Sequence, residues 1–174
     1  ILEELAYVSV PLAIQFASSA ILGSSALNDL GTGRQKNEFL PACVDGAIRI
    51  ALAAGKPGDP FRPDARAPRF IQIGGHYRLS GVWNYVLLAD QADLFIVAAM
   101  DSEALKEWSF FLIRPQKGVL VERIDTLGLK GSSVCRLKLD DVIVTPDDVL
   151  GGTGQIGRAK EQWEQLSGLR SLSC

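Results

Sequence analysis

Histidine and cysteine, the residues that most protein zinc sites require, are scarce in this chain. Its 174 residues include one histidine, His76, and three cysteines, Cys43, Cys135 and Cys174, which share no C-x-x-C spacing. We therefore predict no metal-binding residues. An odd number of widely spaced cysteines fits a reducing compartment better than a disulfide framework, so we predict a cytoplasmic location.

Neither sign of charge prevails along the chain. It carries 18 lysine and arginine and 20 aspartate and glutamate residues, interspersed along its length, for a net charge of −2. No basic surface for nucleic acid is indicated. Hydrophobic residues make up 47% of the chain and charged residues 22%, which is typical of a packed globular protein. Because it begins at Ile1 with neither an initiator methionine nor a signal segment, we interpret it as a processed or excised fragment.

Charge is absent altogether from residues 5–28. By length alone, this stretch could cross a bilayer. Hydroxyl and amide side chains argue against a lipid-facing helix, because they need hydrogen-bond partners that lipid does not offer. Among the polar residues of this stretch are Ser9, Gln15, Ser18, Ser19, Ser24 and Ser25, and it also contains Pro11. We predict a helix buried in protein over most of its surface, and no membrane span.

A glycine pattern near the end of the chain raises the question of a dinucleotide site. Gly152, Gly154 and Gly157 have the G-x-G-x-x-G spacing. That fingerprint requires a preceding strand, a following helix and a second strand with an acidic residue about 20 positions on. No acidic residue follows Glu164, and the chain ends at Cys174. We interpret the glycines as a bend between a strand and a helix, not as an NAD site.

Helical spacing occurs at both ends of the chain. Residues 1–45 have this pattern, with a restart at Pro11, a break at residues 31–33 and a second helix over residues 34–44. A last amphipathic helix is predicted over residues 158–172.

Between these helices, short runs rich in Val, Ile, Phe and Tyr alternate with turn residues. About eight strands are predicted, at residues 48–53, 70–75, 77–88, 93–100, 108–114, 119–125, 133–140 and 141–145. This pattern indicates an α+β chain with an antiparallel β-barrel or sandwich flanked by helices. The predicted helical, barrel and truncated helical domains are residues 1–46, 47–152 and 153–174.

Taken alone, the residues offer no complete active site. His76 has no carboxylate or nucleophile neighbour of the kind that a catalytic triad needs. Asp140–Asp141 and Asp147–Asp148 are adjacent pairs, typical of turns and caps rather than of the separated carboxylates of acid–base catalysis. We predict no catalytic residue in this chain.

The order of several motifs resembles that of acyl-CoA dehydrogenases. "GTGRQKNEFLPACVDG" (residues 31–46) resembles the end of the family's N-terminal helical domain. "YRLSG" (77–81) and "ADQADLFIVAA" (89–99) are similar to its middle domain, as are "LGLKGS" (127–132) and "LDDVIVTPDDVLG" (139–151). The resemblance covers essentially the whole chain. In this family, the stretch that corresponds to the glycine pattern joins the β domain to the C-terminal helices.

The resemblance implies an FAD-dependent oxidoreductase that removes two hydrogens from Cα and Cβ of an acyl-CoA. In the family, a carboxylate base takes the α proton, the flavin takes a hydride from the β carbon, and electrons leave through an electron-transferring flavoprotein. Its members are usually tetramers built from dimers. The expected partners are therefore an acyl-CoA or related acyl thioester, the electron-transferring flavoprotein, and further subunits in a homo- or hetero-oligomer.

The resemblance also implies which residues form one wall of the flavin pocket. Ala53 and Gly55 match the family's flavin loop, and Tyr85 and Leu87 match its "W-I-(T/S)" motif. Tyr85 keeps an aromatic face, whereas Gly55 and Leu87 stand where the family has hydroxyls. Each lost hydroxyl would cost about 1–3 kcal/mol if a flavin polar atom goes unpaired, so FAD could be bound weakly or not at all. Backbone N–H groups at Ala53, Gly55 and Leu87 could still donate hydrogen bonds to the flavin.

Two functions stay open. One is part of an acyl-CoA dehydrogenase-type enzyme whose catalytic base lies outside this chain, so that the chain alone is inactive. The alternative is a non-catalytic paralogue or subunit of the same fold that has lost tight FAD binding and acts as a structural partner. Because the serine near the acyl-CoA phosphates is absent, an enzyme for a non-CoA acyl group, or a flavin monooxygenase of this fold, also stays open.

Overall fold

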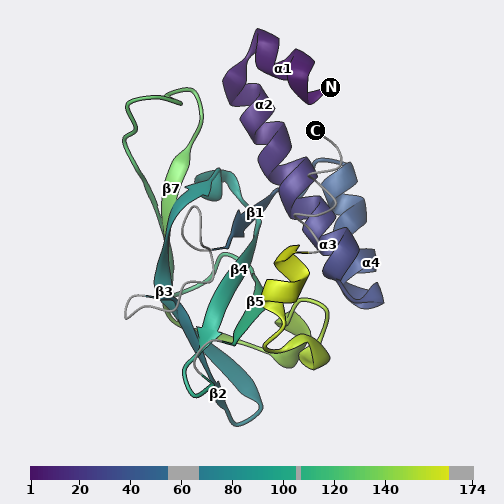
Figure 1. The fold of residues 1–174 in the computed structure, drawn as a ribbon, viewed down its shortest axis with the longest axis vertical. Helices are drawn as coiled ribbons and strands as arrows, with labels where there is room; N and C mark the ends of the chain where they lie inside the picture. The colour runs from purple at the N-terminus through teal and green to yellow at the C-terminus, as the bar shows by residue number, and fades with distance from the viewer. Residues whose placement is uncertain (55–66, 105–106, 165–174) are drawn as a thin grey trace.

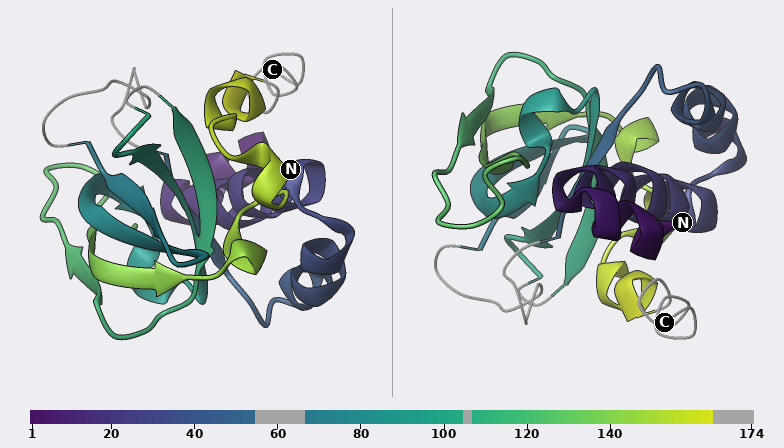
Figure 2. Two further views of the ribbon diagram at one scale, coloured as in Figure 1. Left: turned by 90° about the horizontal axis from the view of Figure 1, so that it is seen from below. Right: turned by 90° about the horizontal axis from the view of Figure 1, so that it is seen from above.

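The helices lie against one side of a curled β-sheet (Figure 1). The computed structural model describes residues 1–54, 67–104 and 107–164. Views from below and from above show the helices together on one side and the curled strands on the other (Figure 2). The predicted α+β class, a β domain flanked by helices, is thereby confirmed.

The N-terminal part is a helical rod with one break. Its segments are α1 (Leu2–Val8), α2 (Val10–Phe16), the π-helical η1 (Ala17–Gly23) and α3 (Ser24–Leu30). The break falls at Ser9, whose backbone is extended. Pro11 lies in the first turn of α2, where a missing N–H costs no intrahelical hydrogen bond. The predicted restart at Pro11 is therefore confirmed.

A capping box starts the next helix, α4 (Gly33–Val44). The Thr32 hydroxyl accepts a hydrogen bond from the Gln35 backbone N–H, and the Gln35 side chain accepts one from the Thr32 backbone N–H. Both groups would otherwise lack an intrahelical partner. The second helix predicted from the sequence is thus present, with Phe39 on its buried face.

Much of the uncharged rod is exposed in this chain. Residues 10–30 form a helix long and apolar enough to cross a membrane by length and composition, and 28% of its most apolar window is buried. Ala26, Leu27 and Leu30 pack into the core, as in a soluble core helix, whereas Leu12 is 47% exposed. The prediction that protein covers most of this stretch is wrong for the described residues, because the sheet reaches the rod mainly through β1 at η1.

The sheet contains seven strands in the order β1-β4-β2-β3-β7-β6, with β5 paired to β4. They are β1 (Ile50–Ala53), β2 (Arg69–Ile73), β3 (His76–Leu87), β4 (Leu94–Asp101), β5 (Trp108–Ile113), β6 (Val119–Arg123) and β7 (Val134–Val144). β1 and β2 run parallel to β4, and the other pairs are antiparallel. The sheet is therefore mixed rather than wholly antiparallel. Two reversals, from β2 to β3 and from β3 to β4, return the chain to the direction of β1.

Two predicted strands, 133–140 and 141–145, are one strand, β7. The register between β3 and β7 shifts at Ser80, opposite Asp140 and Asp141. Asp141 has a φ of 50°, and its carboxylate accepts a hydrogen bond of 2.9 Å from the Ser80 hydroxyl. These aspartates thus form a β-bulge, which bends a strand without ending it. Their predicted role as turn residues is wrong for this reason.

β4 separates two hydrophobic cores. Phe95, Val97 and Ala99 face the inside of the curl, while Ile96 and Ala98 face the helices. Burial on both faces explains why this strand reads as a continuous apolar run.

Only part of the last helix lies within the described residues. A helix is present over residues 159–164, and the rest of the predicted helix over 158–172 lies outside the described residues. The division into domains at residues 46 and 152 stays a prediction.

Candidate functional site

β3 is distorted where the resemblance places the flavin. The register to β7 shifts between Trp83 and Val86. Tyr85 lies in this irregularity with a φ of 62°, in the left-handed region that residues other than glycine seldom adopt. Trp83 is 1% exposed, and its Nε1–H donates to the Ala98 carbonyl at 3.0 Å, whereas Tyr85 is 60% exposed. An aromatic ring displayed on strained backbone offers a face to a planar ligand.

Leu87 lies two residues further, near the end of β3. It is half-buried and pairs with Val134 of β7. The following residue, Leu88, has a φ of 57° and donates its backbone N–H to the Ser133 carbonyl at 2.8 Å. The backbone amide of Leu88 is therefore already paired. The side chain of Leu87 can offer only apolar contact.

Ala53 occupies a different environment. It ends β1, is 2% exposed, and its side chain belongs to the core inside the curl. A ligand on this wall could reach its backbone but not its side chain. β1 contacts β3 although the two are not hydrogen-bonded neighbours, so the fold brings together the strands of Ala53 and Tyr85. Gly55, the fourth predicted cofactor residue, lies outside the described residues.

The aspartates after β7 have structural partners. The Asp147 carboxylate accepts a hydrogen bond of 2.6 Å from Arg34, and this bond and the charge of Asp147 raise the pKa of Arg34. Asp148 accepts hydrogen bonds from the backbone N–H and the hydroxyl of Thr145, at 2.8 and 2.7 Å. The predicted capping role of this pair is confirmed by the capping box at η3 (Pro146–Asp148). Among the residues with described positions, no three His, Cys, Asp or Glu side chains could hold a metal ion together.

The glycine pattern follows a turn rather than a strand. η3 precedes it, and η4 (Thr153–Gln155) interrupts it before the last helix. Gly151 and Gly152 have φ values of 80° and 85°. A Cβ at Gly151 would lie 2.8 Å from the Leu30 carbonyl oxygen, so glycine allows this segment to pack against the end of α3. This context differs from that of a dinucleotide fingerprint.

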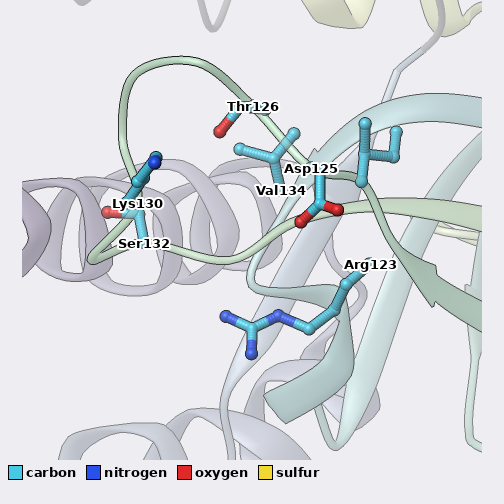
Figure 3. Close-up of a pocket in the computed structure, with 7 residues that line it drawn as sticks. Arg123, Asp125, Thr126, Lys130, Ser132 and Val134 are labelled. Carbon is cyan, nitrogen blue, oxygen red and sulfur yellow. The ribbon is translucent and has the colours of Figure 1, made fainter.

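A pocket that the sequence pattern did not reveal lies between β6 and β7. It has a volume of about 530 Å³ and lies inside the loop that connects the two strands (Figure 3). Its lining residues are Arg123, Ile124, Asp125, Thr126, Lys130, Ser132 and Val134. Part of this loop is the "LGLKGS" motif, which gave a family resemblance but no sign of a cavity. The cavity depends on how the loop folds back toward β7, which a motif does not reveal.

Known proteins similar to this chain include acyl-CoA dehydrogenases, although no model of a protein family matches it. A probable short/branched chain specific acyl-CoA dehydrogenase from Dictyostelium discoideum is 28% identical over 160 residues, which are 88% of this chain and 38% of that protein. Butyryl-CoA dehydrogenase from Megasphaera elsdenii is 23% identical, with a TM-score of 0.84 over 95% of this chain and 44% of its own.

An acyl-CoA dehydrogenase complexed with FAD from Bacillus anthracis is 25% identical, with a TM-score of 0.83 over 95% of this chain and 28% of its own. The chain thus spans less than half the length of these proteins. In sequence and in fold, the chain resembles acyl-CoA dehydrogenases over most of its length.

Proposed function

We propose that this chain is part of an FAD-dependent acyl-CoA dehydrogenase-type oxidoreductase, in which it forms one wall of the flavin pocket. The carrying observation is the agreement of its fold with an FAD-complexed acyl-CoA dehydrogenase, at a TM-score of 0.83 over 95% of the chain. The parent protein would remove two hydrogens from an acyl thioester. We further propose a cytoplasmic oligomer that passes electrons to an electron-transferring flavoprotein.

In this proposal, Tyr85 is the principal contact to the flavin. Tyr85 is 60% exposed, so its ring is accessible for stacking on a planar ring system. Leu87 adds apolar contact beside it, and the backbone of Ala53 and of Gly55 completes the wall. When bound, FAD would supply the hydride acceptor, and these residues would orient its ring and exclude water from one face.

The alternative is a non-catalytic subunit of the same fold that has lost tight FAD binding. The position of Leu87 favours it, because a half-buried leucine offers no hydrogen bond where the resemblance implies a hydroxyl. Such a subunit would act as a structural partner in a hetero-oligomer.

The absorption spectrum of the purified parent protein separates the two proposals. We expect visible flavin bands that stay with the protein through gel filtration and are released by denaturation. A parent protein that is folded by circular dichroism, but remains colourless after incubation with excess FAD, would contradict the flavoenzyme and support the structural subunit.

A further inference from the structure

We propose that the pocket between β6 and β7 binds a phosphate group carried by a small molecule. The pocket lies within the loop of residues 124–133 and takes no part in the flavin wall proposed above. The inference therefore does not depend on the proposed function.

Two cationic side chains reach this pocket from different sides. Arg123 extends from the end of β6, and Lys130 lies on the far part of the loop (Figure 3). Asp125 points toward Arg123 in the same view and is the one carboxylate of the lining. The lining therefore carries an excess of positive charge, in a protein whose net charge is −2.

Both cations keep donors available to a ligand. Arg123 uses Nε for an ion pair of 3.5 Å with Asp90, which leaves its terminal nitrogens for a second anion. Lys130 is exposed, and within the described part of the chain it forms no ion pair. Its ammonium group has three donors and a positive charge, so it can bind an anion.

The pocket also contains an unpaired hydroxyl. Ser132 is 6% exposed, and its Oγ is buried without a hydrogen-bond partner among the described residues. A buried polar group without a partner destabilises the fold, so rotation of this hydroxyl toward a ligand in the pocket would remove that cost. Thr126, in contrast, donates its hydroxyl to the Gly128 carbonyl, which tightens the turn of the loop.

These donors suit phosphate better than carboxylate. Phosphate presents several strong acceptor oxygens in a tetrahedral arrangement, so one group can bind Arg123, Lys130 and a hydroxyl from different directions. A planar carboxylate is matched by a single bidentate arginine. The volume of about 530 Å³ lies in the range of small-molecule sites, so the phosphate can belong to a larger molecule.

Titration of the 15N-labelled chain with inorganic phosphate tests this proposal. We expect saturable amide shifts at Thr126, Lys130 and Ser132, which sodium chloride at equal ionic strength does not reproduce. Lys130→Gln and Arg123→Gln should each weaken phosphate binding about 3- to 10-fold, as expected for loss of one charge-assisted contact. Both side chains are exposed, so neither change threatens the fold.

Lys138→Gln is the matched control, because Lys138 is an exposed lysine of β7 outside the pocket lining. It should leave phosphate affinity unchanged. The proposal is overturned if the shifts do not saturate, if chloride reproduces them, or if Lys138→Gln weakens binding as much as Lys130→Gln. Acetate that binds as tightly as phosphate would overturn the assignment of the ligand as phosphate.

Discussion

Among single residues, Gln35 joins α4 to the segment that follows β7. It is 4% exposed, and its Nε2 donates to the Asp147 and Val149 carbonyls at 2.9 and 2.8 Å. Its Oε1 accepts from the backbone N–H groups of Thr32 and Gly151, at 3.0 and 3.1 Å. Both hydrogens and both lone pairs of the amide are thus used. The exposed ion pairs nearby contribute much less, because solvent screens them.

Gln35→Leu should lower the free energy of unfolding by about 2–4 kcal/mol, because it leaves buried backbone donors and acceptors unpaired. Urea denaturation followed by circular dichroism measures this loss. Gln72→Leu is the control, since Gln72 is exposed on β2 and its replacement should change stability by less than about 0.5 kcal/mol. Equal effects of the two changes would contradict the role assigned to Gln35.

The flavin wall is testable at the same scale. Tyr85→Asn removes the aromatic face while asparagine tolerates the positive φ, so FAD affinity of the parent protein should fall about 2- to 12-fold. Gly55→Thr with Leu87→Thr should tighten FAD binding by restoring the hydroxyls, measurably in a fluorescence titration. Val82→Asn, at an exposed position of β3, should have no effect. Unchanged affinity in all variants, with the fold intact by circular dichroism, would count against this placement of the flavin.

At the scale of the elements, the point where the helix η1 comes closest to the strand β1 is Gly23. A Cβ at Gly23 would lie 2.6 Å from Ile50 Cβ and 2.9 Å from the Ile50 carbonyl oxygen. Real Cβ contacts are not this short, so any larger residue forces the helix away from the strand. Glycine at this position sets the distance between the helical rod and the sheet.

Gly23→Ala should therefore destabilise the chain by about 1–2 kcal/mol, because overpacking outweighs the gain in helix propensity. Gly33→Ala is the matched control: nothing lies within 4 Å of its Cβ position at the start of α4. That change should be neutral or stabilise by up to about 1 kcal/mol. Thermal unfolding compares the two variants, and a Gly23→Ala protein as stable as the original would refute the close packing.

At the scale of the whole molecule, the chain has a complete β core and an incompletely covered helical rod. The sheet encloses one core and shares a second with α3 and α4. Tyr7 and Val8 of α1, by comparison, are 93% and 82% exposed. The chain also spans only 38% of its relative from Dictyostelium discoideum. Activity is therefore expected of the parent protein and not of this chain by itself.

We expect the isolated chain, supplied with FAD and an artificial electron acceptor, not to oxidise any acyl-CoA. One wall of a flavin pocket is proposed here, and none of the described residues is assigned as a base for the α proton. Bleaching of the acceptor dye that depends on both acyl-CoA and the chain would prove this expectation wrong. A related full-length dehydrogenase in the same assay serves as the positive control.

The local pattern of the sequence determined most of the elements. Pro11 and the glycines of residues 31–33 placed the helix boundaries, because their backbone preferences act locally. The apolar run of β4 predicted a strand, and ordered motifs over the whole chain indicated the fold. These features depend on neighbours in sequence, which is why they could be read without a structure.

Contacts between distant residues decided the rest. The parallel pairing of β1 with β4 depends on how the intervening chain reverses, and the bulge at Asp141 depends on Ser80 across the sheet. The burial of Ala53 and the exposure of Tyr85 follow from the curl of the sheet. The pocket around Lys130 follows from the path of a loop. Because these properties arise from packing between segments far apart in the chain, only the tertiary structure could establish them.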